Sequence, residues 1–149
     1  MIGLFDATIS QMVALAVLMP IVASMGGNAA TQTMTVAVRG LATRDLSGFN
    51  TPRIVRKELI VGAINGVGFA VIIGIVAAVW FSSVDLGLVI AIAMVVNMVS
   101  AAAAGILIPI ALDKFDADPA IASGVFVTTV TDVVGFFAFL GLAALWFGI

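Results

Sequence analysis

The sequence predicts an all-α fold, a polytopic membrane helix bundle with four transmembrane helices in this chain. Hydrophobic residues make up 63% of its 149 residues and charged residues only 9%, whereas a soluble domain has roughly 45–50% and 25%. The charged residues leave four long segments almost free of charge. Each segment exceeds the about 20 mainly apolar residues that a helix needs to cross a bilayer. Residues 1–149 are therefore expected to form a single transmembrane domain.

The first predicted span begins near Ile9 and stays almost uncharged until Arg39. At about 1.5 Å per residue it would be about 45 Å long, which exceeds the roughly 30 Å of hydrocarbon in a bilayer. The helix must therefore tilt, bend or protrude. Pro20 and the pair Gly26-Gly27 are the expected bending points.

The other three spans are predicted at residues 59–81, 86–112 and 119–149. The second carries small residues suited to close helix packing, namely Gly62, Gly66 and Gly74. Pro119 can occupy the first turn of the last helix, after a short acidic turn at residues 113–118. The carboxylates of that turn could hold a divalent cation weakly, although a solvated turn is the more common role of such a cluster.

The basic residues predict how the chain is oriented in the membrane. All of them fall between the first and second spans or between the third and fourth: Arg39, Arg44, Arg53, Arg56, Lys57 and Lys114. Four crossings put both connections on one side, which the positive charge predicts to be cytoplasmic. Loops 39–58 and 113–118 are then cytoplasmic, and both chain ends are extracytoplasmic. An external N-terminus without a signal sequence suggests a further helix upstream of Met1, hence five in a complete domain.

Composition also excludes several kinds of chemistry. The chain has no Cys and no His, which removes disulfides, thiolate and imidazole catalysis, and the usual zinc or haem ligands. Its net charge is −2, with six Lys and Arg residues, so no nucleic-acid partner is expected. An enzyme is disfavoured, because Ser and Thr have no His or Lys base within reach. Function must come from carboxylates, amides, hydroxyls and backbone carbonyls.

Asp132 is the most unusual residue in the predicted spans. It follows Pro119 by 13 residues, which places it roughly 20 Å along the last helix and near the middle of the bilayer. Every Lys and Arg is at a loop, so Asp132 must be protonated, face water or bind a cation. A neutral acid hydrogen-bonded to a neighbouring helix is the structural alternative. A functional role is favoured, because acids inside a membrane usually mark ion or proton pathways.

Other polar residues flank this position. Thr128, Asp132 and Gly135 share one helical face, and Thr129 and Thr131 fall to either side. Taken alone, such threonines more often bond to their own backbone.

The first span carries a polar stripe of its own, formed by Asn28, Gln32, Thr35 and Arg39. These residues either face a water-filled path or make amide bonds between helices, and the sequence leaves both open. Asn65 and Asn97 are expected to bond between helices first, with Asn97 also a candidate for the path. Glu58, at a membrane edge, is expected to be solvated or paired locally.

Two stretches resemble a known family. Met25–Gln32 followed by Val38–Thr43 is similar to the second transmembrane helix of the MgtE family of magnesium channels. Asp118–Gly124 followed by Thr128–Gly135 is similar to the family's fifth helix. The resemblance covers essentially the whole chain in order and spacing. The family's first helix and its cytosolic regulatory domains have no counterpart in these residues.

The resemblance implies a homodimer in the lipid membrane, with a pore on the two-fold axis lined by these two helices. It implies that Asp132 of both subunits recognises Mg²⁺, the transported and bound ion, mainly through water. This agrees with the reluctance of Mg²⁺ to lose its hydration shell. The expected pore-lining or supporting residues combine those of these two helices with Asn97, the candidate from the third span. They are Asn28, Gln32, Gly124, Thr128, Thr131, Gly135 and Asn97.

The leading hypothesis is therefore a passive divalent-cation channel domain. The alternative is a proton- or ion-coupled secondary transporter that uses Asp132 as its carrier site. Conductance measured without a pH gradient separates the two. A structural subunit with a merely buried Asp132 would show no flux at all.

Overall fold

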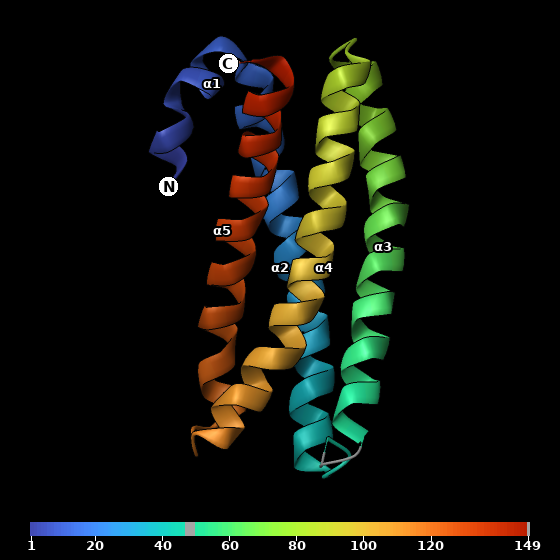
Figure 1. Ribbon diagram of the computed structural model, residues 1–149, viewed down its shortest axis with the longest axis vertical. Coiled ribbons are helices and arrows are strands. Elements are labelled where there is room, and N and C mark those ends of the chain that lie inside the picture. The colour runs from blue at the N-terminus through green and yellow to red at the C-terminus, as the bar shows by residue number, and fades with distance from the viewer. Residues whose placement is uncertain (47–49, 149) are drawn as a thin grey trace.

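The computed structural model describes residues 1–46 and 50–148, and every regular element in these residues is a helix (Figure 1). A short 3-10 helix, η1 (Ile2–Phe5), and a short helix, α1 (Asp6–Gln11), come first. Four long helices follow, α2 (Val13–Ala42), α3 (Thr51–Trp80), α4 (Val84–Lys114) and α5 (Pro119–Phe147). Each contains a segment long and apolar enough to cross a membrane. The predicted all-α polytopic membrane bundle is confirmed.

The first long helix starts later than the sequence predicted. At Met12 the backbone has φ −134° and ψ 85°, which lies outside the helical region and separates α1 from α2. The predicted start near Ile9 therefore falls in α1 and is corrected to Val13. From there α2 continues without interruption through Pro20 and Gly26. Helices in membranes tolerate such residues because neighbouring helices support the backbone.

The second long helix starts earlier than predicted. α3 begins at Thr51 rather than near Leu59, because its basic first turns are helical although they are not apolar. Pro52 lies in the first turn, where its missing N–H leaves no hydrogen bond unmade. The predicted loop 39–58 therefore shrinks to the connection between Ala42 and Thr51, and residues 47–49 lie outside the described residues.

Side-chain caps mark the starts of the last two helices. The Ser83 hydroxyl accepts a hydrogen bond from the Leu86 N–H at 3.2 Å, and the Asp118 carboxylate accepts one from the Ala120 N–H at 2.8 Å. Pro119 is the first residue of α5, as predicted. In the part of the chain that the structure describes, no three acidic side chains come together as a metal site. The acidic turn at 113–118 is a helix connection with a capping carboxylate.

Helix α4 lies at the centre of the bundle. In its apolar window 56% of the residues are buried, against 22% in α3, and it packs against α2, α3 and α5. Figure 1 shows α3 on one side of α4 and α5 on the other, with α2 behind. α2 also packs against α5. The structure is therefore a three-helix group of α2, α4 and α5, with α3 attached through α4.

The basic residues gather at one end of the bundle. The α2–α3 and α4–α5 connections lie at the same end, opposite the α3–α4 connection (Figure 1). All six Lys and Arg residues lie on the first pair of connections or on the helix turns beside them. The charge asymmetry read from the sequence is thus a property of the folded bundle.

The α3–α4 contact depends on glycine at one crossing. A Cβ atom on Gly87 would lie 2.6 Å from the carbonyl oxygen of Gly74, and a Cβ on Gly74 would lie 3.0 Å from the carbonyl oxygen of Gly87. Backbone meets backbone there, as expected for helices that associate through small residues. Gly62 and Gly66 are also buried against α4, so the predicted packing face is confirmed.

We expect Gly87→Ala to lower the free energy of unfolding by about 1–3 kcal/mol, because the added methyl group must push the two backbones apart. The control is Gly68→Ala on the open face of α3, where a Cβ meets nothing within 4 Å. Thermal denaturation of the protein in detergent measures both. Equal stability of the two variants would show that the crossing is not tightly packed.

Candidate functional site

Asp132 lies half-way along α5, and its side chain is exposed on the surface of the single chain. The basic residues of the described chain lie at the ends of α2, α3 and α4 or in the connections. No cation of the described chain is therefore at the depth of Asp132. The carboxylate is thus free to bind a partner that comes from outside the chain. This agrees with the prediction that Asp132 is the unusual residue of the spans.

The threonines around Asp132 bond to their own helix. The Thr128 hydroxyl donates to the Gly124 carbonyl at 3.0 Å, and the Thr129 hydroxyl donates to the Val125 carbonyl at 2.7 Å. Both side chains are exposed. Because their protons are used, these hydroxyls can offer only oxygen lone pairs to a ligand. They are suited to a cation or to the hydrogens of its hydration water, and not to an anion.

Helix α2 presents the predicted amides at a similar depth. Asn28 and Gln32 are exposed and one helical turn apart. Ala30 of α2 packs with Val127 of α5 in one buried cluster. The side chain of Asn97 on α4 lies beside both Gly26 of α2 and Gly135 of α5. Asn28 and Asp132 lie between these two levels, so the structure brings them to the same depth on neighbouring helices.

Three of the predicted residues lie behind this surface. Thr131 and Asn97 are fully buried and Gly135 is buried too. The Thr131 hydroxyl donates to the Thr128 carbonyl at 3.0 Å. These residues can support the polar surface but do not line it in this chain. Asn97 makes the bond between helices that was expected of it first, and its role at a path stays a prediction. Gly124 is half-buried, and its carbonyl accepts the bond from Thr128.

Glu58 is buried, which its position beside the basic residues did not indicate. Its side chain is only 8% exposed, although it was expected to be solvated or paired at a membrane edge. It lines a cavity of about 270 Å³ with Gln32, Thr33 and Asn65, and a second of about 170 Å³ with Arg39. The spacing of Glu58 in the sequence could have indicated this burial. Glu58 continues the four-residue repeat of Gly62, Gly66, Ala70 and Gly74, which packs on α4.

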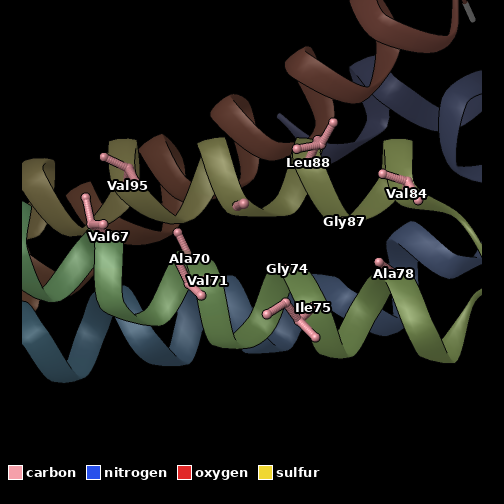
Figure 2. A pocket seen from close by; sticks show the side chains of 11 residues that line it. Val67, Ala70, Val71, Gly74, Ile75, Ala78, Val84, Gly87, Leu88 and Val95 are labelled. Atoms are coloured by element: carbon pink, nitrogen blue, oxygen red, sulfur yellow. The ribbon is translucent and has the colours of Figure 1, made fainter.

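A larger cavity of about 370 Å³ opens between α3 and α4 (Figure 2). Its lining side chains are those of Val, Ala, Ile and Leu, with Gly74 and Gly87 at its floor. It offers no side-chain ligand for an ion. The exposed carboxylate and amides described above lie instead on α5 and α2.

The fold and this surface define a class of protein, namely polytopic α-helical membrane proteins with a polar surface and an intramembrane carboxylate. The particular family follows from comparison with known sequences. The MgtE family, described as "Divalent cation transporter", matches residues 19–142 of the chain. The chain belongs to this family, as the resemblance of its motifs implied.

Three relatives carry the name "Magnesium transporter MgtE". Those of Enterococcus faecalis and Bacillus subtilis are 36% and 34% identical over 98% and 95% of this chain. That of Thermus thermophilus is 32% identical over 95% of this chain. The matched part is 32%, 32% and 31% of these relatives. The chain thus spans about a third of their length.

Proposed function

We propose that this chain forms the ion-conducting transmembrane part of a passive Mg²⁺ channel, with Asp132 as the ion-recognition residue. The observation that carries the proposal is the exposed Asp132 carboxylate half-way along α5, at a depth where the described chain supplies no cation. Family membership supports a role in divalent-cation transport, and the named relatives are magnesium transporters. Nothing in this reading requires catalysis, and the matched family is one of transporters, not enzymes.

The chemistry of the polar surface suits hydrated Mg²⁺. This ion prefers oxygen ligands, loses water reluctantly and commonly keeps several waters while one or two carboxylates hold it. The amide oxygens of Asn28 and Gln32 and the hydroxyl oxygens of Thr128 and Thr129 can accept hydrogen bonds from that water. Asp132 supplies the negative charge. A charged side chain at this depth is costly unless water or a counter-ion meets it, so the surface faces a water-filled path.

A second copy of the chain completes the path in this proposal. One carboxylate holds a divalent ion poorly against its hydration energy, whereas a two-fold axis brings a second carboxylate from the same sequence. The exposed polar groups of α2 and α5 would also be unfavourable against lipid. We therefore place the two-fold axis, and the homodimer interface around the path, beside α2 and α5.

The alternative is a proton- or ion-coupled transporter in which Asp132 is the carrier site. The observation that favours it is the single carboxylate that each chain exposes in the membrane, since acids of this kind also relay protons. A steady Mg²⁺ current under voltage alone, with equal pH on both sides, supports the channel. A flux that requires a pH or second-ion gradient supports the transporter.

We expect Asp132→Asn to reduce Mg²⁺ flux into liposomes to the background level, because it removes the mid-membrane charge while keeping the side-chain shape. Helical content should stay unchanged, since the residue is exposed and caps no helix. Asp6→Asn, which removes an exposed carboxylate of α1, serves as the matched control and should keep the wild-type flux. Full Mg²⁺ selectivity in an assembled Asp132→Asn protein would exclude Asp132 as the recognition residue.

Mg²⁺ should stabilise the wild-type dimer by mass action, by about 2.7 kcal/mol at 100 times the dissociation constant. The melting temperature in detergent should therefore rise with Mg²⁺ concentration, and mass measurement should give two chains per particle. The Asp132→Asn variant should lose the rise, and a monovalent salt at equal ionic strength should not reproduce it. A melting temperature that ignores Mg²⁺ in the wild type would argue against the shared site.

We propose that the protein lies in the cell membrane with the α2–α3 and α4–α5 connections, which replace the predicted loops 39–58 and 113–118, in the cytoplasm and the α3–α4 connection outside. The chain has no native Cys, so single cysteines report its orientation without background. Ser82→Cys should react with an impermeant thiol reagent on intact cells, and Asp45→Cys only after permeabilisation. The opposite pattern would invert the proposed topology.

A further inference from the structure

Asn97 joins the three helices of the central group. It lies on α4 and is fully buried. Its Nδ2 donates a hydrogen bond of 2.7 Å to the carbonyl oxygen of Val22 on α2. Among the described side chains, the only other hydrogen bond between different helices joins Trp146 to Asp85 at the end of the bundle. The Asn97 bond is thus the one side-chain hydrogen bond between helices inside the described bundle.

Two glycines, one from each neighbouring helix, make room for this amide. A Cβ atom on Gly135 of α5 would lie 2.8 Å from Nδ2 of Asn97. A Cβ atom on Gly26 of α2 would overlap the same nitrogen even more closely. Real side chains do not approach so closely, so any larger residue at either position must displace Asn97 or its own helix. The amide and the two glycines form one interlocking contact between α2, α4 and α5.

This contact lies directly behind the polar surface. Gly135 follows Asp132 by three residues on α5, and Gly26 precedes Asn28 by two residues on α2. The depth and rotation of both polar residues are therefore set within one helical turn of the amide. A change in the Asn97 contact would move α2 relative to α5 where the ion-binding oxygens are carried.

We propose that Asn97 is a positioning residue, which fixes α2 and α5 against each other so that Asn28 and Asp132 stay exposed at the same depth. The inference rests on the proposed function only in taking that surface as the ion path. It differs from a role as a pore-lining ligand, because the side chain of Asn97 is inside the bundle.

Stability alone does not account for an amide here. The Oδ1 atom of Asn97 is buried and has no hydrogen-bond partner among the described residues, and an unmet acceptor in an apolar interior is unfavourable. An apolar side chain would leave no polar atom unmet. Buried polar side chains that cost stability are best attested as devices that fix the register of packed helices. The hydrogen bond to Val22 and the two glycine contacts supply that register here.

The test is a rescue experiment on the complete chain in liposomes and detergent. Gly26→Ala and Gly135→Ala should each lower the melting temperature by about 2–12 °C, since the added methyl group clashes with the buried Asn97 amide. Adding Asn97→Ala to either variant should restore most of the loss, because the new methyl group occupies the volume that the amide leaves. Gly68→Ala, on the open face of α3, is the control and should not respond to Asn97→Ala.

Measurements of Mg²⁺ transport distinguish a positioning role of Asn97 from a role in packing alone. Asn97→Ala alone should shift the half-saturating Mg²⁺ concentration, or the preference for Mg²⁺ over Ca²⁺, by about threefold to tenfold, which lies within the coupling found between contacting residues. If Asn97→Ala does not assemble, Asn97→Ser, which is smaller and replaces the amide donor with a hydroxyl donor, serves in the same design.

The outcomes are distinct. Rescue with altered Mg²⁺ selectivity supports positioning. Rescue with both the half-saturating Mg²⁺ concentration and the selectivity of the wild type in Asn97→Ala reduces the residue to a packing role and overturns the proposal, as does a failure of rescue at both glycines.

A pair of introduced cysteines distinguishes a failure of the positioning role of Asn97 from a failure of the proposed function. Ala30→Cys and Val127→Cys replace two residues of one buried cluster, which α2 and α5 form together with Ala101 of α4. Their rate of oxidative cross-linking should fall when Asn97→Ala is added. If the wild type conducts no Mg²⁺ but rescue and slower cross-linking are both found, the helix-positioning role stands and the proposed function fails. Unchanged cross-linking overturns the positioning role whatever the flux.

Discussion

The structure depends on one constraint, which is that a polar group in hydrocarbon needs a partner. The backbone meets this constraint by forming helices, whose hydrogen bonds are made within each segment. The exposed threonines meet it in the same way, since the hydroxyls of Thr31, Thr35, Thr128 and Thr129 all donate to carbonyls of their own helix. Asp132 and the amides of α2 cannot satisfy themselves like this. In the proposed function their partner comes from beyond the single chain, and this gives α2 and α5 a different role from α3 and α4.

The central helix shows how such a surface can be held in place. α4 has the largest buried share of the four spans, and its small residues let its neighbours approach closely. It therefore serves as a common support for α2 and α5, which pack on it and on each other. Asn97 is the exception among its buried apolar residues, and it sits where both neighbours carry glycine. The polar residue Asn97 of α4 thus lies at the same depth as the polar surface of α2 and α5.

Much of this could be predicted from the sequence. Hydropathy identified four spans because the cost of burying charge is large and acts over whole segments. The isolation of Asp132 followed from where the cations fall. Helix ends were less accurate: hydropathy placed the start of α3 at the edge of its apolar run, although its helix begins at Thr51 and carries the basic residues. The break at Met12 also has no Gly or Pro to mark it.

Residue contacts were the hardest part to predict, because they depend on the rotation of each helix about its axis. Asn97 was correctly expected to bond between helices, but its interior position required knowledge of which face of α4 meets α2 and α5. Thr131 and Thr128 are close in sequence, yet one is buried and the other exposed. For Glu58 the sequence did contain a usable pattern, since it continues the small-residue repeat of α3 toward the basic end. Its charge obscured that pattern.

The arrangement separates two tasks between helix pairs. α3 packs on α4 through backbone contact at Gly74 and Gly87, and the apolar cavity between them offers no side-chain ion ligand. α2 and α5 carry the carboxylate and most of the exposed amides but bury less of their surface than α4 does. Helices that carry such a polar surface cannot form the whole hydrophobic core themselves, because each position with an exposed ligand is lost to apolar packing. The central helix α4 supplies the missing burial, and so α2 and α5 can keep their polar residues exposed without loss of the bundle.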